Sequence, residues 1–407
     1  MRVFFVNRFF HPDHSATSQI ASDLAFELAA RGLQVVAITS RQRYDDAAAA
    51  LPRTEVVRGV CIMRLRTPIF GRDNLAGRAL DYLGFYFGAM WSVLRSVRRG
   101  DVVVAMTDPP LLGVALWPAA ALRGARLVHW LQDLFPEIAE RLGVRAIRPL
   151  APVLRAMRNA VLRRGHATVV IGAAMGRLVE RECGRAPTLI PNWALEEETD
   201  SAAKTLTARL DHPLRREWSL GDAFIVGYSG NMGRAHQLDD LIDAATLLKD
   251  EQGIAFLLIG EGAQRATLGR AARERRLANL QFRPYQARLM LRTSLTLPDI
   301  HVVSLDARLE GLMVPSKFVG VIALGKPVLW LGAETGEVGA LLQASQAGIV
   351  VPPADAAALA AAIRALARDP ARLQSMAAQA HSLWQRQFRR ADALTRWERL
   401  LAGIMRE

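Results

Sequence analysis

Short apolar runs alternate with segments of helical periodicity along most of the chain, and this alternation limits the possible folds more than any other feature. Residues 2–6 and 33–39 are two such runs, and between them apolar residues recur at helical spacing from 18 to 31. A strand, a crossover helix and a second strand form a βαβ unit, whose strands are parallel. The same order restarts at residue 224 and continues to 351. The sequence therefore predicts an α/β protein with two Rossmann-like, doubly wound parallel sheets.

A polar stretch separates the two series of strands and helices. Chains longer than about 250–300 residues usually divide into domains, and this chain has 407 residues. Residues 196–211 are charged and lack a strand pattern, which is typical of a linker. We expect a first domain over residues 1–195, joined by a C-terminal helix at about 380–407 that crosses back to it, and a second domain over residues 196–379. Three aromatic residues could anchor that crossing helix: Trp384, Phe388 and Trp397.

The stretch from 301 to 328, HVVSLDARLEGLMVPSKFVGVIALGKPV, has the pattern of a strand, a loop, a helix and a second strand. In a parallel sheet, loops at the carboxyl ends of strands bind ligands, and a helix N-terminus there offers unpaired N–H groups to an anion. Lys317, beside Ser316, would bring a positive charge to a phosphate. Glu310 would accept hydrogen bonds from hydroxyl groups. One anionic end and one hydroxylated end describe a nucleotide sugar.

A second ligand loop follows the predicted strand at residues 224–228. Its sequence is SGNMGR, so that Gly230, Asn231, Gly233 and Arg234 stand directly after the strand. Glycines let a backbone approach a pyrophosphate closely, and an arginine adds a fixed fork of hydrogen-bond donors. We expect this loop to bind the phosphates of the same ligand.

The stretch EGL-x-VPSKF at residues 310–318 resembles the donor-site signature of family 4 glycosyltransferases with the GT-B fold. It is most similar to the variant in bacterial transferases for fucosamine or colanic-acid-type sugars. Gly320 stands where many relatives have a second glutamate that binds ribose, so the ribose contact is unassigned. Relatives also have a lysine soon after the arginine of the phosphate loop, where this chain has His236 or Gln237.

The resemblance covers nearly the whole chain and implies two domains that face across a cleft. It implies a retaining transfer of a hexosyl or aminohexosyl group from a UDP- or GDP-sugar. It also assigns the base of the nucleotide to the loop 283–286, through main-chain groups near Arg283 and stacking on Tyr285.

Two further sets of candidates belong to the first domain. Asp133 follows the strand at 126–131, where many relatives have His-Asp, and its carboxylate would accept a proton from a hydroxyl or hold a sugar hydroxyl. His129, inside the same strand, is expected to be a packed residue. The turn at 10–17 lies near the acceptor in relatives, so His11, His14 and Ser15 are acceptor-side candidates. The two histidines also fit ordinary surface positions.

The formal net charge of +13 calls for an acidic partner or surface. The arginines are scattered, without interleaved aromatic residues or a nucleic-acid motif, so nucleic acid is not the favoured partner. Residues 147–164 have helical spacing with arginines between the apolar positions, and such a helix can lie at an anionic lipid surface. The alternative is that its apolar stripe packs on its own domain. The arginines are Arg148, Arg155, Arg158, Arg163 and Arg164.

The remaining signals concern compartment and cofactors. Cys61 and Cys183 lie far apart without metal-ligand spacing, so neither a disulfide framework nor a zinc site is expected. No signal peptide and no apolar run of about 18 residues stands out. No metal and no other cofactor is expected, because neither an Asp-x-Asp motif nor a G-x-G-x-x-G loop suits the site. We expect a cytoplasmic protein, peripheral on the inner face of the cell membrane.

The leading hypothesis is a glycosyltransferase with a nucleotide-sugar donor and a lipid-linked or glycan acceptor, acting in cell-surface polysaccharide synthesis. Two alternatives stay open from the sequence. A nucleotide-sugar epimerase of the same fold would need no lipid or glycan acceptor. A basic nucleic-acid-binding α/β protein would rest on the charge alone.

Overall fold

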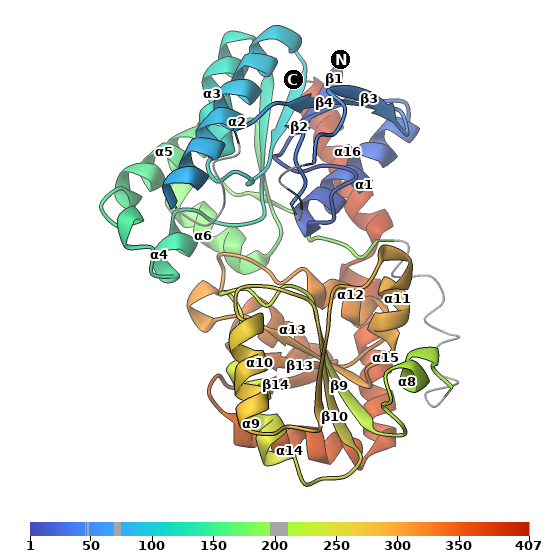
Figure 1. Ribbon diagram of the computed structural model, residues 1–407. Helices are drawn as coiled ribbons and strands as arrows, with labels where there is room; N and C mark the ends of the chain where they lie inside the picture. Colours follow the sequence, from blue (N-terminus) through green and yellow to red (C-terminus); the bar gives the residue numbers. More distant parts are fainter. Residues whose placement is uncertain (45, 47–48, 69–74, 196–210, 407) are drawn as a thin grey trace. The chain divides into compact units, whose positions relative to one another are not determined.

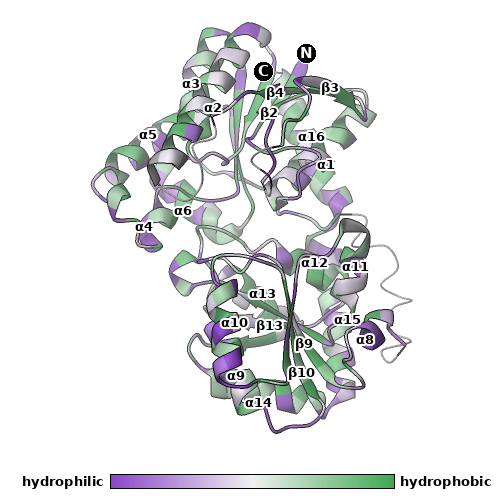
Figure 2. Ribbon diagram, in the orientation of Figure 1, coloured by the Kyte–Doolittle hydropathy of each residue, from purple (hydrophilic) through white to green (hydrophobic). Residues whose placement is uncertain are grey.

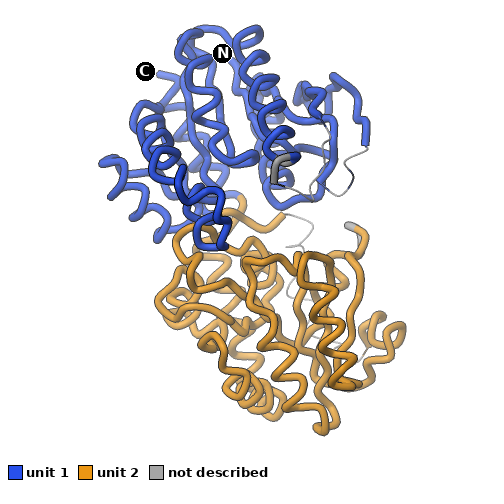
Figure 3. The backbone as a smooth tube through the Cα atoms, turned by 60° about the vertical axis from the view of Figure 1, so that its left-hand side comes forward, with its two compact units in different colours: residues 1–191, 391–407 blue, residues 192–390 orange. Residues whose placement is uncertain are grey.

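The structure is a computed structural model in which the chain forms two compact units (Figure 3). It describes residues 1–44, 46, 49–68, 75–195 and 211–406. Unit 1 comprises Met1–Pro191 and Ala391–Glu407, and unit 2 comprises Asn192–Arg390. The sequence placed the two boundaries at 195 and about 380. The polar stretch predicted as a linker lies, except for Asp211, outside the described residues.

Unit 1 is built on an eight-stranded sheet with the order β3-β4-β2-β1-β5-β6-β7-β8 (Figure 1). Every neighbouring pair is parallel except β3 and β4. The strands are β1 (Arg2–Val6), β2 (Gln34–Ser40), β3 (Thr54–Val57), β4 (Val60–Leu65), β5 (Val102–Ala105), β6 (Arg126–Leu131), β7 (Ala167–Val170) and β8 (Thr188–Leu189). The helices are α1 (Ala16–Ala30), α2 (Leu75–Ser96), α3 (Leu112–Leu122), α4 (Glu137–Arg141), α5 (Ala151–Arg164), α6 (Ala173–Cys183) and α16 (Arg390–Arg406), with a short 3-10 helix at Arg145–Ile147.

The apolar pattern of residues 56–65 predicts a single strand, and the antiparallel pair of β3 and β4 corrects this detail. The segment is a β-hairpin, and Arg58 and Gly59 form its two-residue turn with φ angles of 48° and 81°. Tight hairpin turns need positive φ at both central residues, which glycine adopts at little cost.

Unit 2 is built on a six-stranded, fully parallel sheet with the order β11-β10-β9-β12-β13-β14. The strands are β9 (Phe224–Ser229), β10 (Ile254–Ile259), β11 (Leu280–Arg283), β12 (Ile300–Ser304), β13 (Val328–Leu331) and β14 (Gly348–Val351). The helices are α8 (Pro213–Glu217), α9 (Asp239–Leu247), α10 (Arg265–Glu274), α11 (Arg288–Thr296), α12 (Lys317–Ala323), α13 (Glu337–Ser345), α14 (Ala356–Ala367) and α15 (Pro370–Gln387), with a 3-10 turn at Ala307–Leu309.

Both sheets are buried, as parallel sheets covered on two faces require. Strands β5, β12 and β13 are buried at every position. Figure 2 shows the strands of unit 2 in green, as hydrophobic segments, among helices that carry purple residues. The fold class predicted from the sequence, two Rossmann-like parallel-sheet units, is confirmed.

The C-terminal segment consists of two helices, α15 and α16, where the sequence analysis expected one crossing helix at about 380–407. Phe388 ends α15 and packs edge-on against Phe318 of unit 2, with ring centroids 5.9 Å apart. Helix α16 belongs to unit 1, where Trp397 packs against Trp130 of β6 with centroids 4.7 Å apart. The aromatic anchors therefore serve two different units. None of the helices in the described ranges has the length and hydropathy needed to cross a membrane.

Candidate functional site

Each sheet has one place where the strand order reverses, and in α/β proteins ligands bind at the carboxyl ends of the strands there. In unit 2 the chain passes from β9 to β10 on one side, and β12 returns on the other side of β9. In unit 1 the same reversal lies between β1 and β5. The loops at these two positions contain most of the residues selected from the sequence.

Lys317 occupies the reversal point of unit 2. It is the first residue of α12, and its Nζ donates hydrogen bonds to the hydroxyl of Tyr228 and, at 3.1 Å, to the carbonyl of Asn231. The same ammonium lies over the Tyr228 ring, 4.2 Å from its centroid. Burial lowers the pKa of Lys317 to about 7. Among the described residues no carboxylate lies within ion-pair distance of it, so its charge is held by neutral acceptors alone.

Three glycines bring the loops after β9 and β10 into close contact. A Cβ atom at residue 230 would overlap the side chain of Lys317, and one at residue 260 would overlap the carbonyl of Gly230. A Cβ atom at residue 262 would overlap Asn231 and Met232. All three glycines have φ between 134° and 142°, a range that other residues rarely adopt. The loop at 230–233 is therefore fixed beside Lys317 by glycine at each contact.

His236, which with Gln237 is a candidate for the position of the relatives' lysine, ties this loop to β12. Its Nδ1 donates to the carbonyl of Ser304 at 2.6 Å, and the backbone N–H of Gln237 donates to the Ser304 hydroxyl at 2.9 Å. Burial first, and the charge of Lys317 second, lower the pKa of His236 to about 4. The imidazole is therefore neutral at neutral pH and supports the loop without adding charge.

Glu310 lies in the loop after β12, against the start of α13. The backbone N–H of Glu337 donates to Glu310 Oε2 at 3.3 Å, and Gly336 leaves room for the carboxylate beside it. Burial, and the charge of Glu337 to a lesser degree, raise the pKa of Glu310 to about 7. Its other oxygen, Oε1, is buried and has no hydrogen-bond partner within the described residues. A buried acceptor without a partner is costly, and a ligand hydroxyl would satisfy it.

The other predicted phosphate contacts are more open. Arg234 is exposed, and the described chain shows no ion pair or hydrogen bond of its guanidinium. Ser316 is exposed at the N-cap of α12, and its side chain makes no capping bond. Gly233 is half-buried, and its carbonyl accepts a bond of 2.5 Å from Gln264 Nε2. The structure thus groups Gly230, Asn231 and Lys317 tightly and leaves Arg234 free to move.

The predicted base contacts lie at the end of β11. The Arg283 side chain lies over the ring of Trp218, 5.1 Å from its centroid, and donates to Gln281. Its carbonyl accepts a hydrogen bond of 2.9 Å from Gly260 N. Tyr285 is 54% exposed. Burial first, and the neighbouring Tyr285 second, raise the pKa of Tyr228. Tyr285 therefore stands near the Lys317 group with more than half of its surface exposed, whereas the Arg283 guanidinium is engaged with Gln281 and Trp218.

Unit 1 presents carboxylates at its reversal point. The backbone N–H of Arg8, after β1, donates to the carbonyl of Asp108, after β5, at 2.6 Å. Asp133 follows β6, and burial first, then the charge of Asp108, raise the pKa of Asp133 to about 6. The Arg8 guanidinium is buried, 3.9 Å from Asp81 and stacked near Phe9 and Tyr82. Asp133 can therefore serve as a proton acceptor close to neutral pH.

The acceptor-side candidates begin α1. His11 is half-buried, its ring packs edge-on against Phe26 at 5.4 Å, and its backbone donates to Ser22 and accepts from Arg64. His14 is exposed, and Ser15 is the N-cap residue of α1 with a buried hydroxyl that lacks a partner in the described chain. His11 has a structural position, while His14 and Ser15 keep polar groups available.

His129 is a packed strand residue, as expected. It is buried, and Gly113 and Gly165 leave the space that its ring fills. Burial lowers its pKa to about 4.

Sequence reasoning missed Tyr228, Arg8 and Asp108. Tyr228 is the penultimate residue of an apolar strand and looked like core. Arg8 and Asp108 had a usable signal, since each is a charged residue within a few positions of a strand end at the reversal of strand order.

Two family models match the chain. The model described as "Glycosyl transferase 4-like domain" matches residues 16–193, and the one described as "Glycosyl transferases group 1" matches residues 223–369. Among curated proteins, the chain is 29% identical over 299 residues to one named probable glycosyltransferase WbjE of Pseudomonas aeruginosa, covering 72% of each chain. It is 24% identical over 376 residues to the protein named as a colanic acid biosynthesis glycosyl transferase, WcaI, of Escherichia coli, covering 87% of this chain and 89% of that one.

Solved structures share the fold at low identity. Sucrose-phosphate synthase of Thermosynechococcus elongatus superposes with a TM-score of 0.79 at 17% identity, over 99% of both chains. Anabaena HepE in complex with UDP-glucose superposes with a TM-score of 0.71 at 15% identity, over 100% of both chains. At these identities the likeness establishes the architecture, and both units take part in it.

Proposed function

Because the chain belongs to family 4 of the glycosyltransferases, with the GT-B fold, we propose that it transfers a sugar from a nucleoside diphosphate donor. The donor is a UDP- or GDP-sugar, and the transferred group is a hexosyl or aminohexosyl residue. The acceptor is lipid-linked or a glycan in cell-surface polysaccharide synthesis, and the anomeric configuration is retained. The curated relatives that carry glycosyltransferase names favour transfer over the epimerase and nucleic-acid alternatives.

The observation that carries the proposal is the ammonium of Lys317, which has only neutral acceptors among the described residues, beside the glycine-fixed loop of Gly230 and Asn231. A diphosphate would accept hydrogen bonds from this ammonium and from the backbone N–H groups of the loop. Charge grows on the diphosphate as the glycosidic bond breaks, so a fixed cation there lowers the barrier. Arg234 would close over the same phosphates. With two cations available, the proposal includes no metal and no further cofactor.

Glu310 and Asp133 have distinct parts in the proposal. Glu310 would hold a sugar hydroxyl through Oε1 while its other oxygen stays bound to the start of α13. Asp133, in unit 1, would accept the proton of the acceptor hydroxyl, which its raised pKa of about 6 allows near neutral pH. The exposed ring of Tyr285 would stack on the base of the nucleotide. A nucleotide sugar, UDP-glucose, is the ligand named for HepE.

A thermal-shift screen of UDP, GDP, ADP and CDP, with Lys317→Ala as the control, tests the donor site. A ligand at about 100 times its Kd adds roughly 2.7 kcal/mol of apparent stability. We expect UDP or GDP to raise the Tm of the parent and to have a much smaller effect on the variant. Equal shifts in both proteins would place the nucleotide elsewhere, and no shift with any nucleotide would remove the donor assignment.

We also propose that the protein works at an anionic membrane surface, through a different helix from the one the sequence favoured. Arg155 and Arg158 of α5 are committed to ion pairs with Glu137 and Glu140 of α4 and Glu182 of α6. Arg158 is buried, so its expected lipid-facing role is wrong, because it fastens α5 to its own unit. Substituting it would test folding and not lipid binding.

Helix α2 offers a better surface. Its inward side packs Phe85, Ala89 and Val93 into the core. Four large apolar side chains on the other side are exposed, spaced as one helical stripe: Leu80 48%, Leu83 47%, Phe87 64% and Trp91 57%. The stripe ends at Arg95, which lies over the Trp91 ring at 5.0 Å, followed by exposed Arg98 and Arg99. The only acidic residue of α2, Asp81, is buried, so the stripe combines apolar area with positive charge.

Sedimentation with phosphatidylglycerol vesicles tests this surface. Phe87→Ser/Trp91→Ser should bind at least about tenfold more weakly than the parent, since each side chain loses its apolar transfer energy. Val153→Ser/Met157→Ser on α5 is the matched control, because both residues are exposed apolar positions of unit 1. Equal binding by the α2 variant and the parent would remove α2 from the proposal, and a loss confined to the α5 variant would restore α5.

A further inference from the structure

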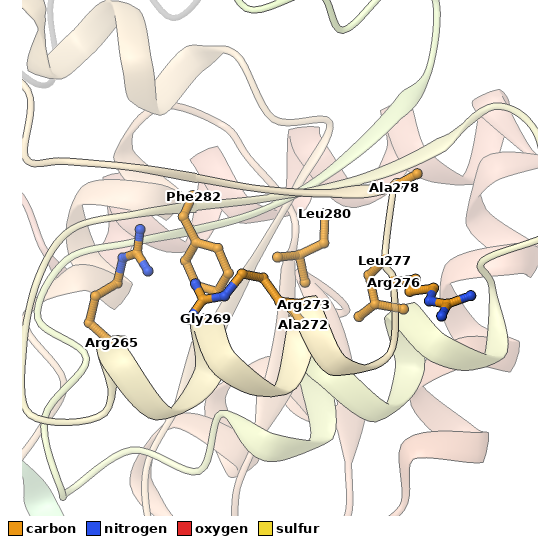
Figure 4. Close-up of a pocket in the computed structure, with 9 residues that line it drawn as sticks. All are labelled: Arg265, Gly269, Ala272, Arg273, Arg276, Leu277, Ala278, Leu280 and Phe282. Atoms are coloured by element: carbon orange, nitrogen blue, oxygen red, sulfur yellow. The ribbon is translucent and has the colours of Figure 1, made fainter.

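A shallow pocket of about 370 Å³ lies along one side of α10 in unit 2, lined by this helix, by β11 and by the turn that joins them (Figure 4). It contains none of the residues assigned to the donor. Arg265, Arg273 and Arg276 lie along it, and Leu277, Leu280 and Phe282 supply apolar lining. No aspartate or glutamate is among its described lining residues. The pocket is therefore positively charged around an apolar floor.

Two of the arginines converge on one point. Gly269 stands between them on α10, and a Cβ atom there would lie 3.0 Å from Arg265 Nη1 and 3.6 Å from Arg273 Nη1. Arg265 also lies 4.0 Å over the Phe282 ring, and its Nε is buried without a partner in the described chain. Like charges held close together repel each other unless an anion lies between them. Neither arginine forms an ion pair with a carboxylate of the described residues, so a bound anion would balance their charge.

We propose that this pocket binds a small anion, a phosphate or carboxylate attached to an apolar or ring-shaped group. The anion accepts hydrogen bonds from Arg265 and Arg273, and Arg276 adds a third guanidinium at the end of α10. Guanidinium groups recognise phosphate and carboxylate in a bidentate manner. The attached group lies on Leu277 and Leu280. Gly269 keeps the space between the two arginines open, which a large side chain would occupy.

The pocket is connected directly to the loops assigned to the donor. Gln264, which immediately precedes α10, donates from Nε2 to the carbonyls of Gly233 and His236 at 2.5 and 2.8 Å. Its backbone N–H donates to the carbonyl of Met232 at 3.0 Å. At the other wall, Phe282 immediately precedes Arg283. An anion that fixes the start of α10 therefore changes the affinity for the donor, and the donor changes the affinity for the anion by the same factor. This coupling, unlike the binding itself, rests on the proposed function.

Calorimetric titration with phenyl phosphate tests the site, with inorganic phosphate and phenol as the two partial probes. We expect phenyl phosphate to bind more tightly than either. Arg273→Gln/Arg276→Gln should weaken it at least tenfold, and Gly269→Leu, which fills the pocket without removing charge, should do the same. Arg270→Gln is the matched control, because Arg270 is an exposed arginine of α10 outside the pocket, and its affinity should stay within twofold of the parent.

Lys317→Ala distinguishes binding at this pocket from binding at the donor loops. It should leave the affinity for phenyl phosphate unchanged. A loss in Lys317→Ala with none in Arg273→Gln/Arg276→Gln would place the probe at the donor phosphates and overturn the proposal. Equal affinity of the double variant and Arg270→Gln, or no binding by the parent, would overturn it as well. Tm values of all variants check that each is folded. If UDP does not bind, only the proposed coupling between the pocket and the donor loops is overturned, and the anion site is not.

Discussion

The two points at which the sheets reverse their strand order carry basic residues in opposite situations. In unit 1 the guanidinium of Arg8 is buried between Phe9 and Tyr82, within 3.9 Å of Asp81. In unit 2 the ammonium of Lys317 has only neutral acceptors within the described part of the chain. The first cation has a carboxylate of its own unit beside it, and Asp133, after the next strand but one, is the carboxylate there whose pKa is raised, to about 6. The second is left for a ligand.

This difference explains how two sheets of the same architecture can bind two different substrates. A cation with neutral acceptors beside a glycine-fixed loop suits an anionic donor, and the Asp133 carboxylate, with its raised pKa, suits a hydroxylated acceptor. The comparison predicts that substitutions in unit 2 change either donor affinity or sugar transfer, whereas substitutions in unit 1 leave the nucleotide untouched.

The largest effect is expected for Glu310→Gln. Turnover with the full donor should fall about 100-fold or more, because the carboxylate is used mainly as the transition state forms. Affinity for the nucleoside diphosphate should stay nearly intact, since the sugar contact is absent from that ligand. Steady-state rates test the turnover, and calorimetry on the same preparation tests the affinity for the nucleoside diphosphate. Turnover like that of the parent would remove Glu310 from the sugar side.

Asp133→Asn should lower turnover about 10- to 100-fold while leaving diphosphate binding unchanged. The amide keeps the shape of the side chain but cannot accept the proton. This variant sharpens the comparison, because it is the counterpart in unit 1 of Glu310→Gln. Any loss of diphosphate affinity beyond twofold would contradict the separation of the two roles.

Lys317→Ala should weaken the nucleoside diphosphate about 10- to 100-fold, corresponding to a charge-assisted hydrogen bond of roughly 1.5–3 kcal/mol. Arg234→Ala should have the smaller effect of the two, because its exposed side chain must be ordered on binding. The free nucleoside should bind almost as before in both variants. Calorimetric titrations with the diphosphate and with the nucleoside measure the two affinities. Equal losses of affinity for both ligands would show that these cations do not contact the phosphates.

The smallest effect, when measured over a single pH unit, is a pH dependence. Burial lowers the pKa of Lys317 to about 7, so the unliganded lysine loses its proton as pH rises above 7, while the diphosphate requires the charged form. Diphosphate affinity should therefore fall by up to about tenfold per pH unit from 7 to 9, with proton uptake on binding. Lys317→Arg stays charged throughout this range and should show a flat profile. A parent profile as flat as that of the variant would show that the lysine keeps its proton without ligand.

The sequence predicted the sheets well, because the buried strands of a parallel sheet are continuous apolar runs. It failed where the signal was local and weak. The hairpin turn at Arg58-Gly59 lacks the usual Asn-Gly or Asp-Gly, and the break between α15 and α16 at Phe388 has neither glycine nor proline. Both features are decided by packing with residues far away in the chain.

The donor loops could be found from sequence because strand ends and glycines mark them. Side chains that pair with residues far away in the chain could not be found in this way. The carboxylates that pair with Arg158 of α5 lie 21 and 24 residues away, on two other helices, so its helical pattern alone gave no sign that it is buried. Tyr228 could not be recognised because a tyrosine at the end of an apolar strand fits the core equally well. The exposed stripe of α2 became visible only when the opposite side was known to pack inward.

The membership of α16 in unit 1 has a consequence for synthesis on the ribosome. Trp397 covers Trp130 of β6, and Arg126 of the same strand donates to the carbonyl of Met405 at 3.2 Å. These partners leave the ribosome only after all of unit 2, and translation adds about 5–20 residues per second. The nascent first unit must therefore wait many seconds with the Trp130 face uncovered while unit 2 folds. A chaperone that shields this face during translation would protect the chain at its most aggregation-prone stage.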